Sequence, residues 1–151
     1  MNHVYEVLDI IKDELRNTIG CNTVSFGLLS EVDLDKTTIF PLAHIIMGQA
    51  RPTQVVEFDF TIILADIVDE NKEEAKDDEF YGNNNLQDVL NTQFEVGNRV
   101  ISRLRRSQKF IGSYELVSDP TMDVMIDRFS NLLAGWELNF TVGLKNGISI
   151  C

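Results

Sequence analysis

Two stretches of the chain repeat hydrophobic residues every three or four positions, the period of an amphipathic α-helix. The first predicts a helix from about residue 2 to residue 17 that ends near Gly20. The second predicts a helix over about 86–106, with the asparagines at 83–85 available to cap its first turn. Its hydrophobic stripe comprises Leu86, Leu90, Phe94 or Gln93, Gly97, Ile101 and Leu104. Each helix therefore has one face to bury.

The remaining hydrophobic residues alternate or cluster as they do in β-strands. The predicted strands cover about 23–28, 38–47, 54–68, 110–117, 122–129 and 134–144. The segment 48–52 favours a hairpin between the second and third strands, and 118–120 predicts a turn between the fourth and fifth. In 54–68 one face is apolar and the other begins polar. In 38–47 both faces are apolar, which predicts that both are covered.

This order of elements predicts an α+β fold, with a largely antiparallel sheet and two helices packed on one face. A length of 151 residues is typical of one domain, so we expect a single domain over 1–151. The segment at about 66–85 carries eight acidic residues against two lysines, and we expect a solvated loop there.

The charge of the chain restricts its partners. With 24 acidic and 13 basic residues, the formal net charge is −11. Such a surface repels nucleic acid, which disfavours sequence-specific binding and is compatible with DNA that passes nearby. No secretory signal or long apolar segment is present at the sequence level, so no membrane association is expected.

Few residues suggest catalytic or metal chemistry. Cys21 and Cys151 lack the spacing of a zinc site and are expected to be free or buried thiols. His3 and His44 are the only histidines, and His44 is expected at the rim of the sheet. Common nucleophile and phosphate-binding motifs are missing, so we predict no enzyme, no catalytic residues and no cofactor. Glu57 and Asp59 share one side of a strand, a geometry that metal-dependent hydrolases use to hold Mg²⁺, although a solvated or subunit-facing surface is the favoured interpretation.

Three further features suggest contacts with other molecules. A basic cluster near the end of the second helix could bind phosphate or an acidic partner subunit, or could simply complement the helix dipole. It contains Arg99, Arg103, Arg105, Arg106 and Lys109. Trp136 is expected in the core, and it also suits an interface anchor. Ile148 and Ile150 could add a strand to the sheet of the same protomer or of a neighbour.

Several segments together resemble a known group of proteins. These are Phe40-Pro41-Leu42, the long strand at 55–66, the helix after a polar loop, and the closing Leu133-Ala134-Gly135-Trp136-Glu137-Leu138-Asn139-Phe140. In element order and in these motifs, nearly the whole chain resembles tail-terminator, tail-completion and neck-ring proteins of tailed bacteriophages, including those of crAss-like phages. The resemblance transfers no catalytic residues.

That resemblance implies a virion structural protein at the head–tail junction or tail, present in the host cytoplasm during assembly. Its partners would be about six or twelve copies of itself in a closed ring, other neck, portal or tail proteins, and genomic DNA in the lumen without sequence-specific binding. We expect the interface between copies to include Phe40, Leu42, Arg103, Arg106, Trp136, Ile148 and Ile150. The alternatives are a small-ligand or adaptor-binding module and a metal-dependent hydrolase using Glu57 and Asp59.

Overall fold

Helical periodicity and strand alternation in the sequence correspond to two helices and six strands among the residues described by the computed structural model. These residues are 3–17, 21–28, 39–68, 86–110, 114–128 and 132–145. The elements are α1 (His3–Arg16), β1 (Thr23–Phe26), β2 (Leu42–Pro52), β3 (Val55–Ile67), α2 (Leu86–Phe110), β4 (Tyr114–Leu116), β5 (Thr121–Arg128) and β6 (Leu132–Lys145). The expected α+β class is confirmed.

The strands form one sheet in the order β1-β2-β3-β6-β4, and β5 also pairs with β6. β1 runs parallel to β2, whereas all other pairs are antiparallel. Because β3 occupies one edge of β6, β4 and β5 share the other edge, one after the other. In the described part of the sheet, the outermost strands are therefore β1 on one side and the β4/β5 line on the other.

The two longest strands, β3 and β6, form the centre of the sheet. They pair from Val55 opposite Lys145 to Ile67 opposite Leu133, without a register shift. Apolar side chains alternate along both strands, so one face of this ladder is continuously hydrophobic. Phe60 and Phe140 stack on that face, with ring centroids 5.6 Å apart.

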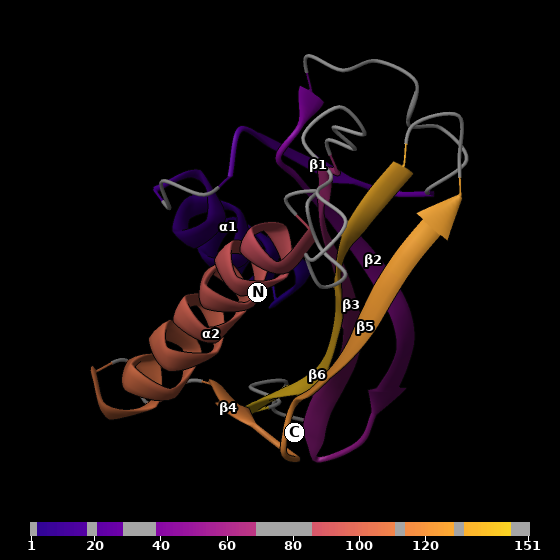
Figure 1. Cartoon of the computed structure of the whole chain (residues 1–151). Helices are drawn as coiled ribbons and strands as arrows, with labels where there is room; N and C mark the ends of the chain where they lie inside the picture. Colours follow the sequence, from indigo (N-terminus) through magenta and orange to yellow (C-terminus); the bar gives the residue numbers. More distant parts are fainter. Residues whose placement is uncertain are drawn as a thin grey trace, which may run out of the picture.

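Both helices cover this hydrophobic face, as the sequence predicted, and Figure 1 shows them side by side against the sheet. α1 contributes Val7, Leu8, Ile11 and Leu15, and α2 contributes Val96, Val100, Ile101 and Leu104. These side chains are buried because each helix places its apolar positions three and four residues apart.

The opposite face is divided along its length. One end holds a smaller hydrophobic cluster of Phe40, Leu42, Ile63, Ala65 and Leu133, and the other end is polar. In β2, Leu42 lies in this cluster whereas Ala43 and Ile45 face the helices. The prediction that both faces of this strand are covered is confirmed, because all three residues are buried.

The hairpin differs from the prediction. The expected loop at 48–52 is mostly strand, because β2 continues to Pro52 and pairs with β3 up to Val56. The register shifts between Met47 and Ala50, where three steps along β2 match two along β3. A one-residue bulge therefore absorbs Gly48 and Gln49, and the turn is confined to Thr53 and Gln54.

The second half of the fold differs at two boundaries. α2 continues past the expected end at Arg106 to Phe110, since Gln108 and Lys109 are good helix formers, and β4 is reduced to Tyr114–Leu116. The segment 118–120 does not reverse the chain, as a hairpin turn would. Instead, β4 and β5 run in the same direction along β6, and residues 117–120 stand opposite only two residues of β6.

The first residues of the acidic segment form strand instead of the expected loop. Asp66 and Ile67 belong to β3, and burial raises the pKa of Asp66 although its carboxylate accepts a hydrogen bond from the Ile67 amide at 2.8 Å. The expectations for residues 69–85 and for the terminal segment with Ile148 and Ile150 lie outside the described residues.

Gly135 provides a test of the central ladder. A Cβ built there would lie 1.7 Å from the carbonyl oxygen of Leu64, whereas one at Gly48 would make ordinary contacts from 3.4 Å. We predict that Gly135→Ala lowers the free energy of unfolding by about 3 kcal/mol or more, because backbone must move. Gly48→Ala should change it by no more than about 0.5 kcal/mol. Denaturant unfolding of both variants checks this, and equal midpoints would contradict the close approach of β3 and β6.

Candidate functional site

The polar end of the uncovered sheet face holds a cluster centred on Arg51. Arg51 Nε donates to Glu57 Oε2 at 2.8 Å, and its Nη1 and Nη2 donate to the two carboxylate oxygens of Asp59, each at 2.8 Å. Thr141 Oγ1 donates to Asp59 Oδ1 at 2.7 Å. The strand register explains the arrangement, since Arg51 is opposite Glu57 and Asp59 is opposite Thr141. The guanidinium thus joins β2 to β3, and the Thr141 hydroxyl extends the cluster from Asp59 to β6.

The electrostatics of this cluster favour a fixed ion pair. The hydrogen bonds from Arg51, followed by that from Thr141, lower the pKa of Asp59 to about 2. The same contacts raise the pKa of Arg51 further above its ordinary range, first through Asp59 and then through Glu57. The Asp59 carboxylate is therefore charged at neutral pH, and Glu57 and Asp59 are both already bonded to the Arg51 cation.

This geometry bears on the metal-hydrolase alternative. The structure does bring Glu57 and Asp59 together, but Arg51 lies between them, and a divalent cation would have to displace its guanidinium. Within the described residues, no group of three or more His, Cys, Asp or Glu side chains could hold a metal ion. The cluster is better suited to tying the strands together than to chemistry.

A second polar contact links β1 to β2. His44 is only 1% exposed, so it lies in the interior rather than at the expected rim. Its Nε2 lies 2.9 Å from the Gly27 carbonyl, which can only accept, so Nε2 carries the proton. Nδ1 then accepts from Ser25 Oγ at 2.7 Å. The pair resembles a nucleophile and base in composition, yet burial of His44 and bonding of both its nitrogens give it a structural role.

The Cys21 thiol lies close to the same edge. Cys21 is half-buried, and burial raises the pKa of the thiol to about 11. The thiol is therefore protonated at neutral pH and a poor nucleophile. The expectation that Cys21 is a free or buried thiol is confirmed.

A hydrophobic surface lies where α2 meets β6 and β5. Trp136 is half-buried, its Nε1 donates to the Leu90 carbonyl at 2.7 Å, and its ring lies edge-on to Phe94 with centroids 5.7 Å apart. On β5, Val124 pairs with Trp136 and Ile126 pairs with Ala134. We call Phe94, Val124, Ile126 and Trp136 the edge patch.

The edge patch is exposed to an unusual degree for large apolar side chains. Phe94 is 40%, Val124 57% and Ile126 52% exposed. Sequence reasoning expected Trp136 in the core or at an interface, and it named Phe94 or Gln93 for the buried stripe of the second helix. Gln93 is the buried one of the two. Val124 and Ile126 were not singled out. The alternation of Val124 and Ile126 in β5 was visible, but their exposure follows from the position of β5 at the border of the sheet.

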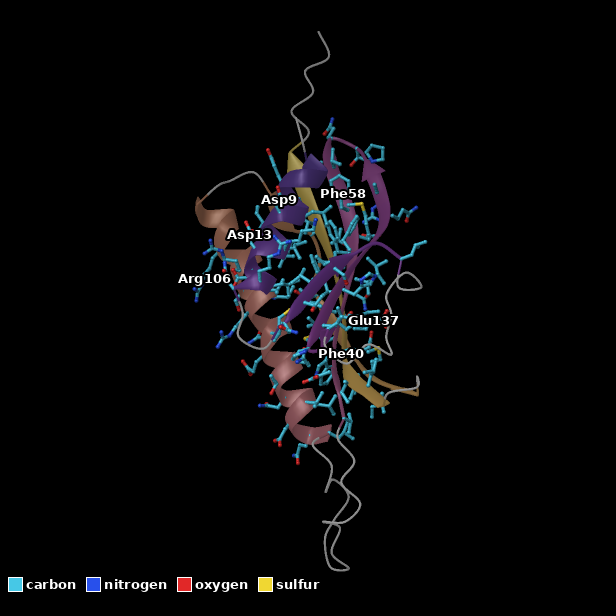
Figure 2. All side chains as sticks on the ribbon, turned by 90° about the horizontal axis from the view of Figure 1, so that it is seen from above. Asp9, Asp13, Phe40, Phe58, Arg106 and Glu137 are labelled. Carbon is cyan, nitrogen blue, oxygen red and sulfur yellow. The ribbon has the colours of Figure 1, made fainter. Side chains whose placement is uncertain are left out.

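The arginines of α2 lie on its outer side. Arg99, Arg103, Arg105 and Arg106 are all exposed, and Arg103 Nε lies 3.7 Å from Glu14 Oε2 of α1. Figure 2 shows Arg106 on the helical layer, together with Asp9 and Asp13 of α1, while Glu137 lies on the other side of the sheet. Cations and acids therefore share the outer surface of the helices, and the arginines do not form a purely basic face.

The residues predicted to form an interface differ in how exposed they are in the structure. Phe40 and Leu42 are buried within the protomer, which gives them a packing role, and their part in an interface stays a prediction. Arg103 and Arg106 are exposed and Trp136 is half-buried in the edge patch. Ile148 and Ile150 lie outside the described residues.

Comparison with protein-family models and with curated proteins found no match for the sequence. Neither helix in the described ranges is long and apolar enough to cross a membrane. The proposals below therefore depend on the geometry of this chain and on the resemblance noted from its sequence.

The Arg51 cluster predicts a specific pH dependence. The pKa of Asp59 is lower in the folded state than its ordinary value of 3.8, so its contribution to stability is present above about pH 4 and is lost as the pH falls toward about 2. Asp59→Asn should lower the melting temperature at neutral pH, and the difference from the unmodified protein should shrink across that window. Thermal unfolding at several pH values measures this, with Glu137→Gln, an exposed acid of the adjacent strand, as control. A constant difference at every pH would contradict the assignment.

Trp136 predicts a second difference in stability. Trp136→Ala should lower the free energy of unfolding by about 3 kcal/mol, because it empties the space between α2 and the sheet. Glu137→Ala, one residue on and exposed, should change it by no more than about 0.5 kcal/mol. Trp136→Phe should cost about 1 kcal/mol, since it leaves the Leu90 carbonyl without this donor. Equal unfolding midpoints for the alanine variants would show that the indole does not pack as described.

Proposed function

We propose that this chain is a structural protein of a phage virion that assembles with copies of itself into a closed ring at the head–tail junction or tail, around a channel for DNA. The observation that carries this proposal is the edge patch. Three large apolar side chains, each 40% exposed or more, surround Trp136 beside an outermost strand. Contiguous apolar surface of this kind commonly marks a protein interface.

The chemistry of the patch suits a protein partner. Aromatic residues are enriched at the centres of interfaces, and charged residues are depleted there. On α2, the positions one turn before and after Phe94 on the same side are Asn91 and Asn98, which are uncharged and exposed. A hydrophobic centre with an uncharged polar border is typical of a surface that another folded chain covers.

The overall charge supports the proposed channel. DNA binding requires cations that displace counterions from phosphates, and the chain carries a net charge of −11. The exposed arginines of α2 share the outer surface of the helices with acidic residues, which lowers the affinity of this surface for a polyanion such as DNA. DNA would therefore pass without sequence-specific binding, as a conduit requires.

The alternative with a supporting observation is an adaptor-binding module, because a different protein could cover the same patch. A lasting monomer would favour it. The metal-dependent hydrolase has less support, since Arg51 holds both Glu57 and Asp59.

Native mass spectrometry and negative-stain electron microscopy test the proposal. We predict a ring of defined copy number for the unmodified protein, and its loss in Val124→Thr/Ile126→Thr, which keeps β-branched side chains but removes apolar surface. Val117→Thr is the control, because Val117 is 43% exposed near the same edge but lies against Gly143, on the other face. A monomer at high concentration would contradict ring formation, and unchanged rings in the double variant would contradict the role of the patch.

A further inference from the structure

Assembly can be assigned to particular strands. The described sheet ends in β1 on one side and in the β4/β5 line on the other, so each protomer presents two different edges. We propose that the β1 edge of one copy pairs with the β5 edge of the next, so that the sheets of neighbouring copies join head to tail. This inference rests on the proposed self-assembly and names the contact that performs it.

Strand direction supports this pairing. β1 and β2 are parallel, and the three antiparallel steps from β2 to β3, β6 and β5 leave β5 antiparallel to β1. Suppose that a second copy continues the sheet with its helices on the same side. Its β1 then lies antiparallel to β5 of the first copy, the arrangement with the better hydrogen-bond geometry. Each copy donates one edge and accepts one, which is the condition for a heterologous contact that closes into a ring.

Side chains at the two edges also match. Val124 and Ile126 project toward the helix-covered face of β5, since their partners Trp136 and Ala134 lie on that face. Phe26 of β1 projects toward the same face, where Lys12 of α1 lies over its ring. Phe26 is 44% exposed, so both edges offer apolar surface on one side of the joined sheet.

Charge distinguishes this pairing from a two-fold contact between β5 edges. From 115 to 126, where side chains are described, the charged residues are Glu115, Asp119 and Asp123, all acidic and exposed. Residues 21–28, which include β1, carry no charged side chain. The charged group that lies over the Phe26 ring is the Lys12 ammonium, which is a cation. A two-fold contact would gather the acids of both β5 edges in one interface, which is unfavourable, whereas β1 against β5 avoids this repulsion.

The length of the contact predicts its strength. β1 has four residues and β5 has eight, so only about half of β5 would be paired. One such contact buries little surface and should be weak alone. A closed ring makes two contacts per copy, and the last contact forms within one assembly, which raises its effective concentration.

Cross-linking of mixed copies tests the orientation. In a background with Cys21→Ser and Cys151→Ser, one sample carries Leu28→Cys, just beyond β1, and the other carries Thr121→Cys, at the start of β5. Both positions are exposed, and antiparallel pairing brings them together. The two samples have different mass tags, are mixed, and receive a short bis-maleimide. Asp13→Cys, exposed on α1, replaces either cysteine as the control.

We expect the product linking position 28 to position 121 to exceed the 121–121 product and both control products. A predominant 121–121 product would overturn the head-to-tail arrangement in favour of a two-fold contact. Rings seen by native mass spectrometry without a 28–121 product would overturn this inference and leave self-assembly standing. Absence of any assembly in the cysteine-free background and in the unmodified protein would overturn both.

Discussion

The uninterrupted pairing of β3 with β6 is the constraint on which the rest of the structure depends. Thirteen residues of β3 lie against β6 in one register, and a single-residue slip would turn every apolar side chain to the wrong face. The backbones approach so closely at Gly135 that a side chain there would overlap Leu64. This register stacks Phe60 on Phe140 under the helices and places Thr141 beside Asp59 on the other face.

The same register also gives the two faces of the sheet different chemical character. The helix-covered face is apolar, and on the opposite face Arg51 forms ion pairs with Glu57 and Asp59. Neither the Arg51 cluster nor the Ser25–His44 contact offers a reactive group, since the carboxylates are paired and His44 is buried and bonded at both nitrogens. What the described protomer leaves for interaction is the border of the sheet, with the main chain of β5 and the edge patch beside it. The proposed function therefore rests on association and not on catalysis.

Local patterns in the sequence were sufficient for the helices, for the facing of β3 and β6, and for the α+β class. They failed where pairing with a neighbouring strand determines the local structure or the exposure of a residue. The segment 48–52 has turn composition, yet pairing with β3 makes it a bulged strand that carries Arg51 to Glu57. Ser25 and His44 meet only because β1 joins β2 in parallel, and the exposure of Val124 follows from the neighbours of β5. Such contacts link residues distant in sequence, which periodicity does not report.

Hydrogen exchange at β5 measures the central claim most directly. In an isolated protomer, the amides of residues 121–128 that point away from β6 should exchange quickly, because no described strand lies beyond them. In assembled protein the account predicts slow exchange at the paired part of this strand and at the outer amides of β1, while the β3–β6 ladder stays protected in both states. Equally fast exchange at β5 before and after assembly would contradict the claim that copies join through this edge.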